Sequence, residues 1–446
     1  MIESLLVANR GEIARRVIRT ARALGVRTVA LHAGVDADLP HVREADEVVA
    51  LPGPAAYRDV EAVVAAARAT GAEAVHPGYG FLSESPALAR ACGKEGLLWV
   101  GPDPESMELL ADKVAARNHV AARGVPVLPG TADAVTGVDG ALAAARRLGY
   151  PLMVKASAGG GGIGMGVAGN DDELGRAVAT AASRGRGAFG DARVLLERYV
   201  SGARHVEVQV LGLPDGSVVA FPAERDCSVQ RRHQKVVEET PSPAVDAPLR
   251  SRLRAAAVTA AQSVGYRNAG TVEFLLQPGT GEFFFLEVNT RLQVEHPITE
   301  EACGVDLVEL QLRVAAGEDV HVEPVEVRGH AMEFRVCAED PVRFLPGPGA
   351  VTEWAEPSGP GIRVDSGYAA GTTVTPHFDP LLAKLVVSGA DRTQVLERAR
   401  DALEAFRVRG PKINLPFLRE VLADPEFTSG TYDTGIVDRL VASRRP

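Results

Sequence analysis

Residues 287–295 read Glu-Val-Asn-Thr-Arg-Leu-Gln-Val-Glu, so polar and apolar side chains alternate along this segment. In an extended chain, successive side chains point to opposite faces with a period of two. One face then carries Glu287, Asn289, Arg291, Gln293 and Glu295. Two carboxylates, two amides and a guanidinium in one row are suited to hold a divalent cation at one end and a small anion at the other.

A second predicted strand, residues 270–276, carries Glu273 and is followed by a turn rich in proline and glycine. A three-residue turn makes Pro278 face Glu282 and places Glu273 opposite Glu287, with Cβ atoms about 4.5–5.5 Å apart. A four-residue turn would place the two carboxylates on opposite faces. Adjacent carboxylates repel, and a bound Mg²⁺ or Mn²⁺ reverses that penalty.

The alternative is an ordinary hairpin with exposed glutamates. Three phenylalanines and a leucine immediately precede Glu287, which predicts a buried position for that residue and favours the cation site.

The composition excludes several classes of protein. A chain of 446 residues predicts two to four domains, and a net charge of −10 argues against nonspecific binding to nucleic acid or anionic membranes. There is no apolar run long enough for a membrane span and no signal-peptide pattern. The four cysteines are far apart in sequence, which indicates a reducing cytoplasm and no structural zinc.

Apolar segments alternate with helical patterns in residues 1–112, which predicts a doubly wound, Rossmann-like domain. Residues 113–328 combine helices with strands. A segment rich in proline and charge near 318–328 indicates a boundary. Residues 329–446 begin with a strand over 330–337 and end with helices over 393–406 and 414–422, which predicts an α+β domain.

Six of the eight residues from Gly159 to Gly166 are glycine, and the strand-borne Lys155 precedes them. Without Cβ atoms, such a loop can bring backbone N–H groups close to phosphate oxygens. The segment is not a P-loop, because no Lys-Ser or Lys-Thr follows it. A flexible hairpin tip is the alternative. The lysine before the loop and the carboxylates downstream favour a phosphate-binding lid.

Residues 227–235 are dense in hydrogen-bond donors, including Gln230, His233 and Lys235. An exposed basic run is one interpretation. Acidic residues flank the segment on both sides, however, so its charge is locally balanced. The donors could equally bind a phosphate or a small oxyanion, and the sequence leaves both interpretations open.

A lysine, a glycine-rich loop, a donor cluster and paired glutamates, in this order, resemble the ATP-grasp fold, and the finer match is to biotin carboxylase. The resemblance is carried by residues 8–14, 76–84, 224–235 and 287–297. It covers essentially the whole chain, and the last two motifs are long and specific. It implies an α/β and α+β multidomain protein in which an ATP-grasp domain has a lid subdomain at about residues 130–200.

The resemblance implies ATP-dependent carboxylation of biotin by bicarbonate. The nucleotide would be bound by Lys113, Lys155, Gly161, Gly162, Glu197, Arg198, Tyr199, Val200, His205, Gln230, His233, Glu273 and Glu287. The metal ligands would be Glu273, Glu287 and Asn289, and bicarbonate would meet Lys235, Arg291, Gln293 and the backbone of Val294. Biotin would meet Tyr79 and Arg335, and the catalytic set would be Arg291, Lys235, Arg335 and Glu295, the last as general base.

Several points stay open beside the resemblance. Arg335 could instead form a buried ion pair with Glu339 or Asp340. Family members often have glycine at the position of Ala158 and a cation at that of Ile163, and the loop here looks more like those of urea-carboxylase-type relatives.

A homodimer is also expected from the resemblance. Arg19 and Arg363 match positions that pair across the family's dimer interface. Ala23 and Pro360, however, replace an acidic and an aromatic partner.

None of the five methionines adjoins a lysine, so a biotinyl-lysine motif is absent from this sequence. The resemblance therefore implies action on a biotin carboxyl carrier protein, together with a carboxyltransferase, in an acetyl-CoA carboxylase of fatty acid biosynthesis or a similar enzyme. The alternatives are a urea or pyruvate carboxylase component, another ATP-grasp ligase, and a non-catalytic ATP-binding subunit.

Overall fold

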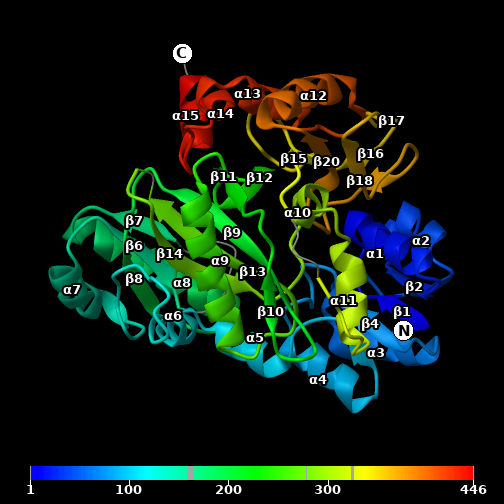
Figure 1. Ribbon diagram of the computed structural model, residues 1–446, viewed down its shortest axis with the longest axis horizontal. Helices are drawn as coiled ribbons and strands as arrows, with labels where there is room; N and C mark the ends of the chain where they lie inside the picture. The colour runs from blue at the N-terminus through cyan, green and yellow to red at the C-terminus, as the bar shows by residue number, and fades with distance from the viewer. Residues whose placement is uncertain (1, 158–164, 278, 323–325, 445–446) are drawn as a thin grey trace.

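A computed structural model of the protein describes residues 2–157, 165–277, 279–322 and 326–444. The N-terminal elements and the group around β6–β8 lie at opposite ends of the molecule, and the C-terminal helices lie beyond one edge of the central sheet (Figure 1). The predicted lid residues Gly161 and Gly162, the substituted positions Ala158 and Ile163, and the turn residue Pro278 lie outside the described residues.

The N-terminal elements form a five-stranded parallel sheet in the order β3-β2-β1-β4-β5, which confirms the doubly wound prediction. Helix α1 buries its predicted face of Ile13, Ala14, Val17, Ile18 and Ala21. The elements are β1 (Ser4–Val7), α1 (Gly11–Ala23), β2 (Arg27–His32), η1 (Gly34–Asp36), α2 (Pro40–Glu44), β3 (Glu47–Ala50), η2 (Pro54–Arg58), α3 (Val60–Ala69), β4 (Ala74–His76), α4 (Pro86–Lys94), β5 (Leu98–Trp99) and α5 (Pro104–Ala111).

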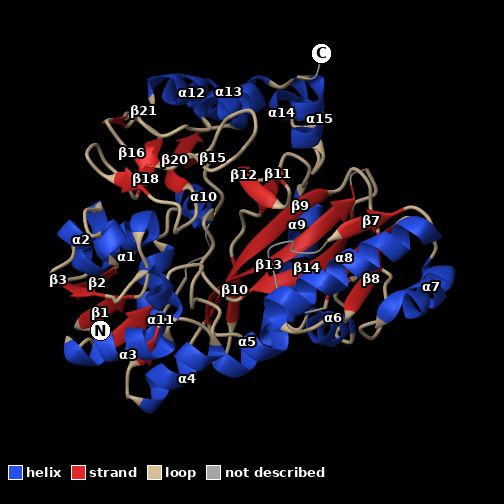
Figure 2. Cartoon of the chain, turned by 180° about the vertical axis from the view of Figure 1, so that it is seen from behind, coloured by secondary structure: helices blue, strands red, loops and turns tan. Residues whose placement is uncertain are grey.

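The middle of the chain contains a small three-stranded sheet, β7-β6-β8, and the first half of a large antiparallel sheet. Helices α7 and α8 pack on the small sheet at the far end of the molecule (Figure 2). The elements are α6 (Lys113–Ala121), α7 (Gly137–Leu148), β6 (Leu152–Ala156), β7 (Gly166–Ala168), α8 (Asp171–Phe189), β8 (Val194–Arg198), β9 (Arg204–Gly212), β10 (Val218–Ala220), β11 (Arg225–Arg231), β12 (Gln234–Thr240), α9 (Ala247–Gln262), β13 (Asn268–Gln277), β14 (Glu282–Asn289), α10 (His296–Cys303) and α11 (Leu307–Ala315).

The large sheet continues into the C-terminal part of the chain, because β12 pairs with β15. Its order is β14-β13-β9-β11-β12-β15-β20-β18, so it crosses the predicted boundary near residues 318–328. The C-terminal elements are β15 (His330–Cys337), β16 (Gly349–Ala350), β17 (Glu353–Ala355), β18 (Ile362–Ser366), β19 (Thr373–Val374), β20 (Leu381–Gly389), α12 (Arg392–Ala405), β21 (Arg407–Arg409), α13 (Leu415–Ala423), α14 (Pro425–Ser429) and α15 (Ile436–Ser443).

The hairpin of β13 and β14 places Glu273 opposite Glu287, as predicted, but for a different reason. Gln277, and not Pro278, pairs with Glu282, so the turn is one residue longer than the prediction required. The pairing register shifts between Glu273 and Phe274, because an extra residue in β14 forms a β-bulge there. This shift brings Glu287 opposite Glu273. Without the bulge, the longer turn would have placed the side chains of Glu273 and Glu287 on opposite faces of the hairpin.

The prediction of one extended segment over residues 287–295 is wrong beyond Asn289. Strand β14 ends at Asn289, and the chain then turns into α10, whose N-cap residue is Glu295. Arg291 and Gln293 therefore lie on a loop and not on a strand face. The turn directs this polar segment around the site, where a straight strand would have led it away.

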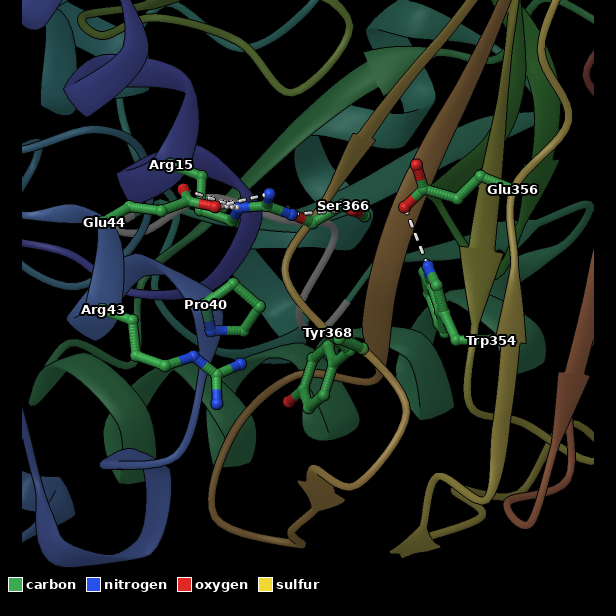
Figure 3. A pocket seen from close by; sticks show the side chains of 9 residues that line it. Arg15, Pro40, Arg43, Glu44, Trp354, Glu356, Ser366 and Tyr368 are labelled. Carbon is green, nitrogen blue, oxygen red and sulfur yellow. Dashed lines mark hydrogen bonds and ion pairs between the residues drawn. The ribbon is translucent and has the colours of Figure 1, made fainter.

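Arg15 of α1 connects the N-terminal domain to strand β18 of the large sheet (Figure 3). Its guanidinium binds Glu44 through Nε at 2.9 Å and donates from Nη1 to the backbone oxygen of Ser366 at 2.6 Å. This contact lies in a surface pocket that Trp354 and Tyr368 also line. Arg15 thus joins α1 to β18, and Glu12 in the first turn of α1 pairs with Lys384 of β20 at 3.1 Å.

Among the described residues, none of the helices combines the length and the apolar character that crossing a bilayer requires. All four cysteines are free thiols, at Cys92, Cys227, Cys303 and Cys337.

Glu239 ties β12 to the C-terminal helices. Its buried carboxylate accepts from Tyr432 at 2.5 Å and pairs with His330 and Arg392, each at 2.7 Å. Burial opposes its ionisation, but His330 and Arg392 outweigh that effect and lower the pKa of Glu239 from 4.5 to about 2. A depressed carboxyl pKa stabilises the fold above the unfolded-state pKa, and this stabilisation is lost as the pH falls toward 2.

We expect Glu239→Gln to lower the free energy of unfolding at pH 7 by about 3 kcal/mol. The deficit relative to the parent should shrink between pH 5 and pH 3, where the parent itself loses the ionic contribution. Chemical unfolding at several pH values measures it. Glu309→Gln, which removes a half-exposed helix pair with Arg313, is the matched control and should cost less than about 0.5 kcal/mol. Equal losses in the two variants would contradict the prediction.

Candidate active site

The ammonium of Lys235 lies among three buried carboxylates. Its Nζ is 2.6 Å from Glu207, 2.9 Å from Glu273 and 2.5 Å from Glu295. These groups come from β12, β9, β13 and the N-cap of α10, so four separate elements must meet for the cluster to form. Burial opposes the charge on Lys235, but the three carboxylates outweigh it and hold its pKa well above the usual value.

The cluster extends to Arg225, which the sequence analysis did not assign to the site. Arg225 is fully buried and contacts Glu207 at 2.5 Å through Nε. Its other nitrogens donate to Gln209, Thr271 and Thr299 at 2.9 Å. Arg225 therefore neutralises Glu207 from the side opposite Lys235. No local pattern in the sequence links Glu207 to Arg225, because the pairing of β9 with β11 brings them together.

Arg335 joins the cluster from β15. Its Nη2 donates to Glu295 Oε2 at 2.8 Å, and its Nε is 2.6 Å from Glu238 Oε1. The alternative partners considered for Arg335 are engaged elsewhere, because Glu339 pairs with Arg231 and Asp340 with Lys412.

Glu295 is held ionised by this arrangement. Burial raises the pKa of its carboxyl group, but Lys235 and Arg335 outweigh that effect and hold it well below the usual value.

The carboxylates of Glu273 and Glu287 form a suitable place for a divalent cation. Asn289 donates to Glu273 at 2.7 Å, and Lys113, the first residue of α6, lies 3.3 Å from Glu287. His205 Nε2 is 2.9 Å from Glu273. Ligand atoms of His205, Glu207 and Glu273 lie within 4.8 Å of one another. The carboxylate and amide oxygens of Glu273, Glu287 and Asn289 are the ligands that Mg²⁺ or Mn²⁺ prefers, and a bound cation would offset the repulsion between the two acids.

Glu273 and His205 shift each other's pKa in opposite directions. Burial disfavours the carboxylate of Glu273, but Lys235 and His205 hold its pKa well below the usual value. Burial likewise opposes protonation of His205, and the charge of Glu273 nevertheless raises the pKa of the imidazole. Gln230 lies against the other ring nitrogen of His205 at 2.6 Å, which joins these two predicted nucleotide contacts.

The remaining predicted nucleotide residues lie on the small sheet and a hairpin tip. Lys155 of β6 forms an ion pair with Glu197 of β8. The N–H groups of Arg198 and Tyr199 donate to backbone oxygens of Pro129 and Pro151, at 2.8 and 3.0 Å.

Within the described part of the chain, the backbone N–H of Val200 has no hydrogen-bond partner. His233 is exposed in the two-residue turn between β11 and β12, where Arg232 and His233 both have positive φ.

The predicted bicarbonate residues lie on the loop between β14 and α10. Arg291 Nε is 3.2 Å from a carboxylate oxygen of Glu84, so a residue of the N-terminal domain also contacts this loop. With its amide nitrogen toward Glu295, Gln293 donates to that carboxylate at 3.2 Å and accepts from Arg291 at 3.1 Å. The backbone oxygen of Val294 accepts from Lys384 at 3.0 Å. Glu84 and Lys384 are additional groups that the sequence analysis missed.

Tyr79 lies next to this cluster. Its hydroxyl donates to Glu12 of α1, and its ring faces Lys384 at 6.0 Å. Burial, reinforced by the charge of Glu12, raises the pKa of Tyr79 well above its usual value, so the hydroxyl stays neutral.

A small three-stranded sheet, a large antiparallel sheet, and a cluster of lysines and paired carboxylates are the parts of an ATP-grasp protein. Three family models match the chain in succession. They are described as Biotin carboxylase, N-terminal domain (residues 1–107), Carbamoyl-phosphate synthase L chain, ATP binding domain (residues 112–322) and Biotin carboxylase C-terminal domain (residues 333–439).

Similar proteins cover nearly the whole chain. A biotin carboxylase of Halalkalibacterium halodurans is 46% identical over 98% of this chain and 97% of its own length. Biotin carboxylase 2 of Bacillus subtilis is 44% identical over 97% of this chain and 98% of its own length.

Among solved structures, the biotin carboxylase domain dimer of Hydrogenobacter thermophilus 2-oxoglutarate carboxylase, in complex with MgADP, ADP and bicarbonate, superimposes with a TM-score of 0.95. It is 40% identical and covers 98% of each chain. The chain therefore belongs to the biotin carboxylase family, whose members are ATP-dependent ligases.

We expect Glu287→Gln to weaken the binding of ADP by about tenfold in the presence of Mg²⁺ and to change it little in EDTA, because only the metal-dependent part of the affinity needs a carboxylate there. Titration calorimetry in the two buffers measures both affinities. Glu282→Gln, on the exposed end of the same strand, is the control and should match the parent. An equal loss with and without Mg²⁺ would assign Glu287 to the nucleotide and not to the metal.

Proposed function

We propose that the protein carboxylates biotin on a separate carrier, using ATP and bicarbonate through carboxyphosphate. The observation that carries the proposal is the buried group of Lys235, Glu295 and Arg335, in which Lys235 also contacts Glu273 of the paired acids on β13 and β14. The cluster brings together residues that can bind phosphate, a loop between β14 and α10 that can bind a small anion, and a carboxylate that can act as a base. Such a set suits phosphoryl transfer to bicarbonate followed by carboxyl transfer.

The nucleotide would lie between the small sheet and the large one. Lys113 and Lys155 would neutralise phosphate oxygens, His205, Gln230 and His233 would line the pocket, and residues 197–200 would meet the adenine, with the N–H of Val200 as donor. Gly161 and Gly162 would cover the phosphates and exclude water. Mg²⁺ held by Glu273, Glu287 and Asn289 would supply charge neutralisation to the phosphates.

Bicarbonate would be bound by Arg291, Gln293 and the backbone of Val294, with Lys235 between it and the γ-phosphate. The guanidinium provides two parallel donors for a planar anion. As a bicarbonate oxygen bonds to the γ-phosphorus, the bond to ADP breaks and ADP leaves with the electron pair. Glu295 accepts the proton of bicarbonate.

Glu295 must become a stronger base when substrates bind. In the free protein, Lys235 and Arg335 hold its pKa low, which makes it a weak proton acceptor. Substrate anions that share Lys235, and a biotin oxygen that takes Arg335, withdraw this stabilisation and raise the pKa of Glu295. Biotin binding should therefore accelerate ATP cleavage through the base itself.

Carboxyphosphate then loses phosphate and releases CO₂ beside the ureido ring. The phosphate released takes the ureido N–H proton, and the nitrogen attacks CO₂. Arg335 would stabilise the negative oxygen of the enolate-like ureido form, and Tyr79 would border the ring.

The partners follow from this chemistry. A biotin carboxyl carrier protein would present the cofactor, and a carboxyltransferase would choose the final acceptor. We also propose a homodimer. Arg19 is 55% exposed and so accessible to a second copy, although it pairs with Asp365 at 3.0 Å, and Arg363 pairs with Glu300 and the same Asp365 within this chain.

We expect ADP release to require bicarbonate, to rise with free biotin, and to fall by at least about a hundredfold in Glu295→Gln, because the base is lost. A coupled spectrophotometric assay measures it, and Glu309→Gln on the surface of α11 is the control. Turnover driven by an amine in place of bicarbonate would indicate another ATP-grasp ligase, and ADP release that survives in Glu295→Gln would contradict the assigned base.

A further inference from the structure

Arg335 is held by two carboxylates with different roles. Its Nη2 meets Glu295, which the proposed reaction protonates, and its Nε meets Glu238, which the proposed reaction does not use. Glu238 is fully buried at the centre of the large sheet, on β12. A second buried acid, Glu333 of β15, lies directly opposite it in the strand register.

These residues share one face of the sheet. In antiparallel strands, paired residues and residues two apart project to the same side, so Glu238, Glu333, Arg335 and its pairing partner Lys384 lie together. Within the described part of the chain, Lys384 makes no ion pair or hydrogen bond with Glu333. Its Nζ pairs with Glu12 at 3.1 Å and donates to the Val294 oxygen at 3.0 Å.

The two acids are in different surroundings. Glu238 Oε1 forms an ion pair with Arg335 Nε at 2.6 Å, although the oxygens of Glu238, like those of Glu333, have no partner in hydrogen-bond geometry within the described part of the chain. No ion pair of this kind reaches Glu333 there. A buried carboxylate without a partner is costly, and a second one beside it adds repulsion. Neutral Glu333 removes both costs and leaves one negative charge on the pair, at the carboxylate that faces Arg335.

The electrostatics agree with this geometry. Burial raises the pKa of Glu333 well above its usual value despite Lys384, and the neighbouring charge of Glu238 raises it further. Burial also raises the pKa of Glu238 to about 7, with Arg335 opposing the rise. The contrast with Glu239 is clear, because the next residue along β12 faces His330 and Arg392 on the other side and has a lowered pKa.

We propose that Glu238 is a positioning residue that anchors Arg335 through Nε, so that the Nη edge can exchange Glu295 for the ureido oxygen of biotin, and that Glu333 beside it is a neutral acid. This inference rests on the proposed function. When Glu295 accepts a proton, its attraction for Arg335 falls. The contact with Glu238 persists through that step and keeps the guanidinium in the site.

Two reactions separate this role from a structural one. ATP cleavage with bicarbonate alone needs Lys235, Arg291 and Glu295, whereas the increase caused by free biotin also needs a positioned Arg335. We expect Glu238→Gln to raise KM for biotin by about tenfold and to change the biotin-free rate by less than about threefold. Glu333→Gln imitates a neutral acid, so both rates should stay within about twofold of the parent.

The outcomes decide each part of the proposal. Equal loss of both reactions in Glu238→Gln, or no change in either, overturns the positioning role. A biotin defect in Glu333→Gln as large as that of Glu238→Gln overturns the neutral acid. If Glu238→Gln does not fold, Glu238→Asp is the variant to test. It keeps the negative charge but moves it away from Arg335, because the side chain is shorter by one methylene group. An unchanged KM for biotin in that variant also overturns the role. A parent protein that shows no bicarbonate-dependent ADP release removes the proposed function itself.

Discussion

The site depends on the balance between buried acids and the few cations placed among them. Lys235 touches three carboxylates, and Arg225 and Arg335 each neutralise one of those three from another side. Removing one member of such a network leaves an uncompensated buried charge, which costs several kcal/mol, on the order of 3–5. The arrangement is therefore suited to ligands that bring their own charge, namely a magnesium nucleotide and a small anion.

This electrostatic requirement explains several features of the fold. Carboxylates from three other elements must meet Lys235 of β12, and the continuous sheet from β14 to β18 connects the strands β9, β12 and β13 that carry this cluster with β15, which carries Arg335. The bulge in β14 keeps Glu287 opposite Glu273 despite a longer turn. The end of β14 at Asn289 allows Arg291 to turn back toward the cluster.

The sequence predicted best those parts of the site whose residues lie close together in the chain. Alternation around Glu273 and Glu287 predicted two paired strands, and their pairing is confirmed, but the bulge that produces it had no sequence signal. Long-range partners such as Arg225 for Glu207, or Glu238 for Arg335, could not be predicted, because strand order and register determine them. The position of Lys384 beside Arg335 likewise depends on the pairing of β20 with β15, which the sequence analysis did not predict.

A crystal structure with ADP and Mn²⁺, with the ion located by its anomalous signal, tests most directly whether a cation lies between the paired acids. We expect a peak between the carboxylates of Glu273 and Glu287, with Lys113 moved from Glu287 toward the phosphates. A nucleotide bound with no peak between these acids, or with their oxygens turned apart, would contradict the claim that a cation compensates their crowding.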